Sequence, residues 1–510
     1  MSEAIDGGIT VTEIAAMDQP IDVSPETTAA FVGRALRGPL NTPVLVHSFG
    51  EFRRRFGDTW SRSSLGPAVK QFFEHGGLQL YIVRIANNAR GAMLCIPASG
   101  SALVLRAVEP GSTETIRAAV DYDGIDGDER FNLTLQRVDP DTGCVDDQEF
   151  FRSVSWSEDA DRFVGTALLT SSLARVEKPY PSHRPECTLD SGNRQGTVYV
   201  EHVQAGTDGT ELSDYDLIGS RKERTGLFAL EKIENFDLLY LPVPGKGVDT
   251  GPAAVLAAEI YCRERRAMLI VDPRAEWHTP ADAARGVRDL GYASSNMVGY
   301  FPRMRERDSD DIPRPAGAAL AGLLCKQDRT QGRWGDLDSA GLGLQRHLVP
   351  AMDVEDEDIK VLQRAGINVV IGGSAGRSRV HGSLTMGRGS ESHRRFNRLP
   401  VQRFCLQVIG AVADATRWAV FEPGDAKLAR RVRGQVLTYL DCLNDLGAFA
   451  DDQFIVKCDS DEHGVSILLV FHPVDCDEPV SLTLHQTAGG CRVGSTAFAP
   501  PYVVAPGSAA

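Results

Sequence analysis

The sequence predicts a multidomain protein that combines α/β and α+β parts. Strand-like and helix-like segments alternate in residues 24–90 and again in 206–394, which favours a central mixed or parallel sheet flanked by helices. Residues 91–205 contain short apolar runs separated by turn residues, so we expect a mostly β insertion there. Residues 395–475 contain two amphipathic helices followed by strands, which indicates a C-terminal α+β domain.

These patterns divide the chain into five parts. At 510 residues the chain is long enough for about three folded domains plus terminal segments. We place an N-terminal arm at 1–23, a discontinuous central α/β domain at 24–90 and 206–394, a mostly β inserted domain at 91–205, a C-terminal α+β domain at 395–475, and a C-terminal arm and tail at 476–510.

The first central segment has the order β-β-α-α-β, with turn residues at each joint. Phe52 and Phe56 lie four residues apart, so they belong on one helix face. The expected elements are strand Ala30–Val32, strand Val44–His47, a helix from Ser48 through Phe56, helix Pro67–His75 and strand Leu80–Ile85.

Similar patterns predict the elements of the remaining domains. The insertion is expected to contain strands Leu103–Ala107, Ile116–Tyr122, Asn132–Val138, Phe150–Val154 and Arg162–Thr170. The second central segment is expected to contain strands Leu238–Val243, Ala267–Val271 and Met297–Tyr300, with helices Ala253–Arg265, Pro280–Leu290 and Gly317–Cys325. The C-terminal domain is expected to contain helices Pro400–Arg417 and Asp425–Leu446 and strands Trp418–Phe421, Phe454–Cys458 and Val465–Phe471. The C-terminal arm is expected to contain the alternating strand Val480–His485.

Composition excludes several classes of function. The formal net charge of −15 argues against broad binding to nucleic acid or to anionic membranes. The ten cysteines are scattered singly without a C-x-x-C pair, which gives no support for zinc or thioredoxin-like chemistry and fits a reducing cytosol. We expect no signal peptide and no membrane span, because no apolar run reaches about 18 residues.

One glycine-rich stretch offers an enzymatic alternative. Gly372–Gly376 fits G-x-S-x-G after an apolar run, so Ser374 could be the nucleophile of an α/β-hydrolase, with Asp414 and His472 as the acid and base. That elbow must lead directly into a helix, but Arg377–Ser383 has the pattern of a turn and a strand. A plain glycine turn is therefore favoured, and the hydrolase remains the alternative.

Other polar clusters are better explained without a ligand. The acidic residues between 121 and 129 depart from the EF-hand loop because Ile125 occupies a ligand position, so a solvated hairpin end is favoured over a calcium site. The acidic run Asp353–Asp358 indicates the first turn of a helix. His381 and His393 flank a basic, glycine-rich stretch that could hold phosphate, but no Walker lysine follows a glycine loop. We expect no metal and no cofactor.

The sequence also resembles a known family in several specific phrases. Residues 24–85 are similar to the N-terminal region of contractile tail sheath proteins, and further similarity extends over roughly residues 8–485. The matching phrases in that first region are Ala30–Gly33, Arg37–Pro39, Pro43–Val46, Ser48-Phe49, Glu51-Phe52, Arg55–Gly57, Phe72-Phe73 and Gly76–Arg84.

This resemblance implies a structural protein rather than an enzyme. A sheath subunit would polymerise as stacked rings or helical strands around an inner tail tube protein, and would contract by subunit rearrangement. Its further partners would be baseplate and tail terminator proteins, with no nucleic acid and no membrane insertion. It would reside in a virion tail or injection particle and be assembled in the cytoplasm of a bacterial host. A static structural virion protein is a further alternative.

The resemblance also implies which segments link subunits. The two arms would add strands to sheets of neighbouring copies by β-augmentation, whereas an ordinary explanation folds both arms onto their own domain. The expected N-arm strand contains Ile9, Thr10, Val11, Thr12 and Ile14, the C-arm strand contains Val480, Leu482 and Leu484, and the receiving-sheet strand contains Val465, Ile467, Leu469 and Phe471.

A basic cluster on the long C-terminal helix is the candidate tube contact. In the family the C-terminal domain is the inner domain, which faces the tube, and the insertion is the outer domain. The cluster is locally unusual in an acidic chain, although a solvated helix face explains it equally well. Its members are Lys427, Arg430, Arg431 and Arg433.

Overall fold

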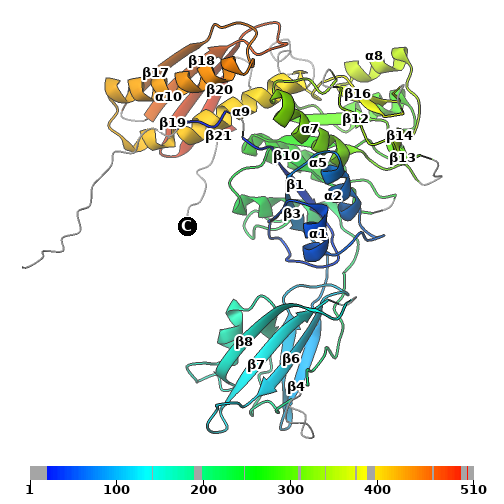
Figure 1. Ribbon diagram of the computed structural model, residues 1–510, viewed down its shortest axis with the longest axis vertical. Coiled ribbons are helices and arrows are strands. Elements are labelled where there is room, and N and C mark those ends of the chain that lie inside the picture. The colour runs from blue at the N-terminus through cyan, green and yellow to red at the C-terminus, as the bar shows by residue number, and fades with distance from the viewer. Residues whose placement is uncertain are drawn as a thin grey trace, which may run out of the picture.

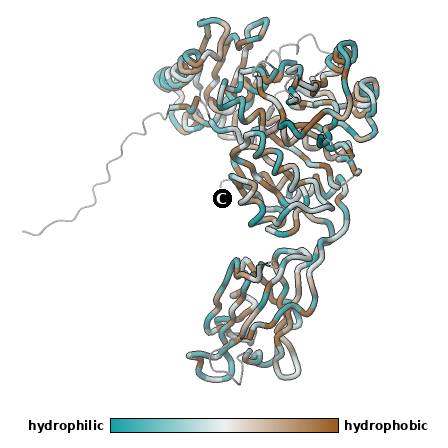
Figure 2. The backbone as a smooth tube through the Cα atoms, turned by 45° about the vertical axis from the view of Figure 1, so that its right-hand side comes forward, coloured by the Kyte–Doolittle hydropathy of each residue, from teal (hydrophilic) through white to brown (hydrophobic). Residues whose placement is uncertain are grey.

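The computed structural model describes most of the chain as three connected bodies. The described residues are 20–23, 25–139, 142–188, 198–245, 247–307, 312–338, 341–373, 376–387, 397–461, 464–495 and 502–503. The mostly β inserted body projects from one end of the central body, and the C-terminal body lies beside the other end (Figure 1). Hydrophobic segments run through each body, as Figure 2 shows. The expected N-arm strand, from Ile9 to Ile14, lies outside the described residues.

An eight-stranded sheet forms the centre of the described chain, in the order β16-β15-β12-β11-β10-β1-β3-β2. The neighbours from β15 to β3 pair in parallel, while β2 and β16 pair antiparallel at the two edges. The strands are β1 (Thr28–Gly33), β2 (Val44–Val46), β3 (Gln79–Arg84), β10 (Leu238–Tyr240), β11 (Met268–Val271), β12 (Met297–Phe301), β15 (Ile367–Ile371) and β16 (Arg379–His381). This mixed sheet has the layout that the strand–helix alternation predicts.

Helices cover both faces of this sheet and bury two apolar cores. On one face lie α1 (Phe49–Phe56), α2 (Leu65–Glu74) and α7 (Gly317–Gln331); on the other lie α4 (Asp214–Ile218), η2 (Gly226–Lys232), α5 (Pro252–Arg265), α6 (Pro280–Asp289) and α8 (Asp356–Arg364). Gly322 lets α7 approach α2 closely, because a Cβ there would lie 2.3 Å from the Phe72 carbonyl oxygen. The first turn of α8 carries Asp356, Glu357 and Asp358, as the acidic run predicts.

The inserted body has its own core between two three-stranded sheets. One sheet contains β4 (Met93–Ala98), β5 (Ser101–Ala107) and β9 (Ala174–Val176); the other contains β6 (Thr115–Asp121), β7 (Arg130–Val138) and β8 (Val145–Ser155). The strand predicted at Arg162–Thr170 is wrong, because this segment forms α3 (Val164–Ala167) and η1 (Leu168–Thr170). Val164 and Leu168 are fully buried four residues apart, which is helical rather than strand spacing.

The C-terminal body packs two helices against an antiparallel sheet. Its elements are α9 (Leu399–Ala415), η4 (Arg417–Phe421), α10 (Ala426–Asp445), β17 (Ile455–Asp461), β18 (Gly464–Phe471), β19 (Val480–Thr487), β20 (Gly490–Ser495) and β21 (Tyr502–Val503). The strand predicted at Trp418–Phe421 is wrong: the Ala419 amide donates to the Thr416 carbonyl, which closes a 3₁₀ turn. A separate two-stranded ladder joins β13 (Met304–Glu306) and β14 (Leu348–Pro350).

One helical stretch among the described residues is long and apolar enough to cross a membrane by length and composition. It runs from Leu399 to Phe421, through α9 and η4. Half of its most apolar window is buried, and Phe404, Val408 and Val412 belong to the core of the C-terminal body. α9 also buries polar residues such as Arg403. We therefore interpret it as a core helix of the C-terminal body.

His75 connects α2 to a distant loop through both ring nitrogens. Nδ1 lies 2.7 Å from the Gln71 carbonyl oxygen, and Nε2 lies 3.1 Å from the Gln345 amide nitrogen. The amide can only donate, so Nε2 must accept and the ring must be neutral. Burial is the main cause that lowers the pKa of His75 below its usual value.

We expect acidification to weaken this connection. A histidine with a lowered folded-state pKa binds fewer protons than in the unfolded chain, so stability falls as pH drops below about 6.5. In His75→Gln, the side-chain oxygen can still accept the Gln345 amide but cannot titrate. Urea-unfolding midpoints at pH 7.5 and 5.5 should show a smaller acid-induced loss in His75→Gln than in the unaltered protein. Equal losses would contradict this role for His75.

Candidate interaction surfaces

A buried ion pair joins the C-terminal body to the central body. Arg403 of α9 donates from both terminal nitrogens to the two carboxylate oxygens of Asp328 in α7, at 2.9 and 2.5 Å. The Thr27 hydroxyl, just before β1, donates to the same carboxylate at 2.5 Å. Both charged side chains are at most 5% exposed. Removing one partner of such a pair costs about 3–5 kcal/mol, so this contact resists rotation between the bodies.

The C-terminal strand lies inside its own sheet. β19 pairs with β18 along one edge and with β20 along the other. The side chains of Val480, Leu482 and Leu484 are at most 1% exposed and belong to the core of their own body. The expectation that this strand forms a C-terminal arm is therefore corrected. Its alternating pattern marks a half-buried strand, but the pattern does not specify which sheet buries it.

The receiving-sheet strand is corrected for the same reason. β18 is occupied by β17 and β19 on its two edges, and its four core-facing residues are buried: Val465, Ile467, Leu469 and Phe471. Within the described part of the chain, β17 pairs with β18 only. β17 carries the exposed residues Ile455, Lys457 and Asp459, and charged side chains are typical of edge strands that remain accessible.

The basic residues of α10 divide into two groups. Lys427 and Arg430 are exposed, and the Arg430 Nε donates to the Ala426 carbonyl of its own helix. Arg431 lies over the Trp418 ring at 4.4 Å. Arg433 donates from Nε to the Val456 carbonyl of β17 at 2.9 Å. Arg431 and Arg433 therefore bind groups of the C-terminal body itself, although Arg433 is also exposed, whereas Lys427 and Arg430 are exposed cations without a contact beyond their own helix in the described residues.

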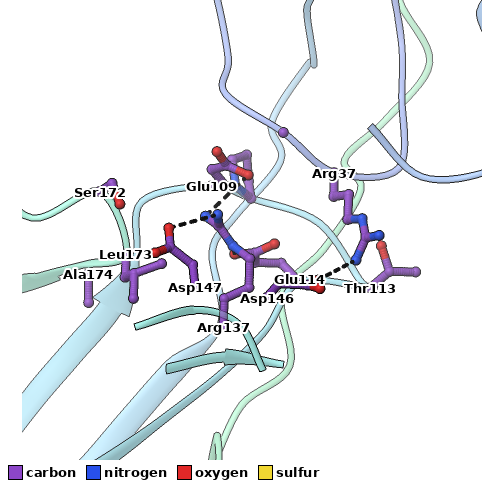
Figure 3. Close-up of polar contacts among 12 residues, drawn as sticks. Arg37, Glu109, Thr113, Glu114, Arg137, Asp146, Asp147, Ser172, Leu173 and Ala174 are labelled. Carbon is purple, nitrogen blue, oxygen red and sulfur yellow. Dashed lines mark hydrogen bonds and ion pairs between the residues drawn. The ribbon is translucent and has the colours of Figure 1, made fainter. Parts of the chain in front are cut away.

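A second charged cluster fixes the inserted body to the central body (Figure 3). Arg137 of β7 lies 2.8 Å from Glu114 and 3.4 Å from Glu109, all at most 8% exposed. Arg55 of α1 reaches the same Glu109 at 3.1 Å, so the cluster links the two bodies. Burial opposes the charge of Arg137, but the carboxylates of Glu114 and Glu109 raise its pKa.

Arg84 also holds this joint, through hydrogen bonds to backbone carbonyls. Its guanidinium is 1% exposed and donates to backbone carbonyls of Ala35, Leu36 and Gly38 in the central body and Pro110 in the insertion. Burial lowers its pKa to about 10, so it keeps its charge at neutral pH. We conclude that the joint is held by buried charged side chains as well as by the connecting chain segments.

The glycine-rich stretch does not have the surroundings of a nucleophile elbow. Ser374 lies outside the described residues, but β15 ends at Ile371 and the chain resumes as β16, antiparallel to β15. The predicted strand after the turn is therefore confirmed. Of the other proposed members, Asp414 accepts from Arg266 at 3.3 Å and His472 contacts Asp451 at 3.0 Å, so each has a different partner.

Side chains fill the sheet edge where α/β enzymes usually bind substrates. β1 ends beside β10 at this edge, and the guanidinium carbons of Arg34 and Arg62 lie 4.8 and 5.4 Å from the centre of the Trp60 ring. A cavity of only about 20 Å³ remains near Asp272. Burial raises the pKa of Asp272 to about 7, and its carboxylate accepts the Tyr240 hydroxyl at 2.6 Å. The hydrogen bond from Tyr240 therefore gives the buried Asp272 carboxylate a structural role within the central body.

Polar clusters among the described residues show no metal-ligand geometry. No group of three or more His, Cys, Asp or Glu side chains in the described ranges could hold a metal ion. At the predicted hairpin end, Asp121 accepts from Asn132 at 2.7 Å and from the Asp123 amide at 3.0 Å. The Asp121 carboxylate thus accepts hydrogen bonds within the turn between β6 and β7.

We expect Arg137→Met to weaken the joint between the two bodies. The substitution would leave Glu114 buried without its cation and Glu109 with Arg55 alone, at a cost of about 3–5 kcal/mol. The inserted body should then unfold at lower temperature than the rest, and protease should cut between residues 204 and 212 sooner. Lys70→Met is the control, because it removes an exposed pair with Glu74 worth at most about 1 kcal/mol. Equal stability of the two variants would contradict the role of the cluster.

We compared the chain with known protein families, curated proteins and solved structures. No family profile matches the chain. It is 26% identical over 313 residues to the tail sheath protein of Vibrio phage KVP40, a match that covers 54% of this chain and 45% of the relative. The chain thus spans just under half the length of that curated relative.

Solved structures match nearly the whole chain at low identity. The sheath tail protein of Listeria innocua has a TM-score of 0.63 at 13% identity, with 92% of this chain and 96% of that chain covered. The sheath tail protein of Desulfitobacterium hafniense has a TM-score of 0.56 at 13% identity, with 94% and 100% covered. The helical sheath protein of the anti-feeding prophage, in its contracted state, has a TM-score of 0.53 at 15% identity, with 94% and 98% covered. The resemblance to contractile tail sheath proteins is therefore confirmed, and the chain has the fold of that family.

Proposed function

We propose that this chain is the structural subunit of a contractile tail sheath, which polymerises around an inner tube and contracts to drive that tube forward. The observation that carries the proposal is the extent of the structural match, since more than nine-tenths of the chain aligns with sheath proteins. The central, inserted and C-terminal bodies are therefore all included. In this proposal the chain works in a virion tail or injection particle that is assembled in the host cytoplasm.

Contraction in this proposal uses the free energy of subunit contacts. The extended lattice is trapped during assembly on the tube and baseplate, and release lets subunits rotate into a lattice that buries more surface. Obligate assemblies bury roughly 2,000–5,000 Å² per interface, so a small gain per subunit sums over many copies. The buried ion pair of Asp328 with Arg403 supports this mechanism, because it lets each subunit transmit force between its bodies.

The N-terminal arm is the proposed link between copies. We assign residues Ile9 to Ile14 to a strand that pairs with a neighbouring subunit, by β-augmentation. β17 is an edge strand of its sheet, and we propose it as the receiving strand; its Val456 carbonyl accepts from Arg433 of α10, which also packs against this strand. Main-chain hydrogen bonds would supply affinity, while the tether near Pro20 and Pro25 would let whole subunits rotate relative to one another.

The tube contact in this proposal is the N-terminal half of α10. Lys427 and Arg430 direct their charges outward and would meet an acidic surface of the inner tube protein. The remaining proposed partners are baseplate and tail terminator proteins. No catalytic step is assigned, because the glycine turn is followed by β16 rather than by a helix. A static virion protein would have the same fold but one assembled form.

Electron microscopy tests the main proposal directly. The purified full-length chain, expressed with and without its tube protein, should form hollow cylinders of two lengths and widths. Contraction explains the two forms because one lattice converts to another. Cylinders of one fixed geometry under all conditions would favour the static alternative, and a persistent monomer at high concentration would contradict the proposal.

Deleting residues 1–18 should abolish polymerisation and leave a folded protein. The deletion removes the whole proposed strand but none of the described core. Circular dichroism would verify folding, and sedimentation would measure assembly. Cylinders that form as well as those of the full chain would remove the proposed link.

Reversing the outward charges of α10 should weaken assembly on the tube. Lys427→Glu with Arg430→Glu replaces two cations by anions facing an acidic partner, while Arg431 and Arg433 keep their internal contacts. The matched control is Arg54→Glu, an exposed residue on α1 of the central body. Co-sedimentation with tubes should fall several-fold in the double variant, and sheath-only polymers should change less. Equal losses in both assays would contradict the tube assignment.

A further inference from the structure

A large groove separates the central and C-terminal bodies. It encloses about 1310 Å³ and is lined by Asn235–Asp237 and Arg265-Arg266 of the central body and by α9, η4 and α10 of the C-terminal body. Residues 20–28 also line it, so the described chain begins inside the groove. A hollow of this size at a joint between bodies has room for a peptide segment rather than for side chains alone.

The groove lining holds five basic and five acidic side chains, but two of its cations, Arg265 and Lys427, form no ion pair with a carboxylate of the described residues. Arg265 donates to the carbonyls of Leu230, Ile233 and Glu234, all of which are neutral acceptors. Lys427 lies at the rim and is exposed. Asp237 and Asp414 are the acidic groups deeper in the wall, and they already bind Arg333 and Arg266. An acidic segment would therefore meet a favourable potential here.

Several polar atoms in the groove wall lack a partner among the described residues. These are the Arg266 Nη1, the Trp418 Nε1 and the Gln407 Oε1. Gln407 is 6% exposed, and its amide nitrogen already holds the Val23 carbonyl at the start of the described chain. These atoms are buried within the wall itself, so they mark incomplete packing at the joint between the two bodies.

The face of α9 that borders the groove is made of small residues. Gly410, Ala411 and Ala415 lie there, and a Cβ at Gly410 would be 4.0 Å from the Arg266 Nη1. Small side chains allow a neighbouring backbone to approach a helix closely. This face thus leaves space that large side chains would otherwise fill.

The N-terminal segment has the composition that fits this groove. Residues 1–19 contain four carboxylates and no lysine or arginine, namely Glu3, Asp6, Glu13 and Asp18. The same segment supplies apolar side chains at Ile5, Ile9, Val11 and Ile14, which suit the groove's Phe236, Leu406 and Trp418. Because the segment is tethered at Pro20 within the groove, its effective concentration there is high, on the order of millimolar.

We propose that, in the unassembled subunit, residues 1–19 dock in the groove of their own chain. This inference rests on the proposed sheath function. In a sheath subunit, docking would keep the arm away from neighbouring copies until assembly. Binding to a neighbour then exchanges one set of contacts for another. Off-tube polymerisation would be slowed, because each subunit must first release its own arm.

Photo-crosslinking of the full-length monomer tests this docking. A benzoylphenylalanine at Ala411 should crosslink to a peptide from residues 1–19, as identified by mass spectrometry. A probe at Thr438, on the exposed side of α10, is the matched control and should give no such link. In a mixture of isotopically light and heavy monomers, each crosslink should join two light peptides or two heavy peptides, because the link forms within one chain.

Charge and salt provide the second measurement. Lys427→Glu should lower the crosslink yield several-fold, whereas Arg430→Glu, one turn away and outside the groove lining, should not. The yield should also fall in about 0.5 M NaCl, where the screening length is only about 4 Å. Links between light and heavy chains, links from Ala411 to another segment, or no link to residues 1–19 would each overturn the proposal. Cylinder formation is scored separately, so docking and the sheath function can fail independently.

Discussion

The contact between Asp328 and Arg403 sets how the central and C-terminal bodies of this protein sit together. It is bidentate, buried and reinforced by the Thr27 hydroxyl, so one site holds α7, α9 and the start of β1. The groove beside it, the outward face of α10 and the edge strand β17 all take their positions from this placement. A different angle between the bodies would break the pair and leave two charges without partners in a dry interior.

The joint to the inserted body follows the same physical logic. Arg55 of α1 reaches across to Glu109, and Arg84 of β3 reaches across to the Pro110 carbonyl, while Arg137 of β7 holds Glu109 and Glu114 from within the insertion. Charged contacts of this kind have strict geometry, and they stabilise one orientation more than apolar packing would. Each subunit should therefore move as one piece when the lattice changes, which confines the conformational work to contacts between copies and to the arms.

Sequence patterns identified the elements that bury a regular apolar face. Phe52 and Phe56 of α1 and the alternating residues of β19 have the expected periodicity, and both segments have the predicted type. Two short segments were misassigned because local composition favours strands where packing selects a helical turn. At Val164–Leu168 the burial is four residues apart, and at Trp418–Phe421 the last residue, Phe421, is 82% exposed. The assignment of β19 to an arm failed because alternation does not report which strands lie on either side. Long-range pairs such as Asp328 with Arg403 leave no periodic signal at all.

The most direct measurement is a cryo-electron microscopy map of cylinders assembled from this chain, at a resolution that separates strands. The account requires β19 to remain between β18 and β20 of its own chain, the Asp328–Arg403 contact to persist, and a strand from another copy to lie along β17. A map in which β19 pairs with a neighbouring copy, or in which the C-terminal body has rotated away from α7, would contradict it.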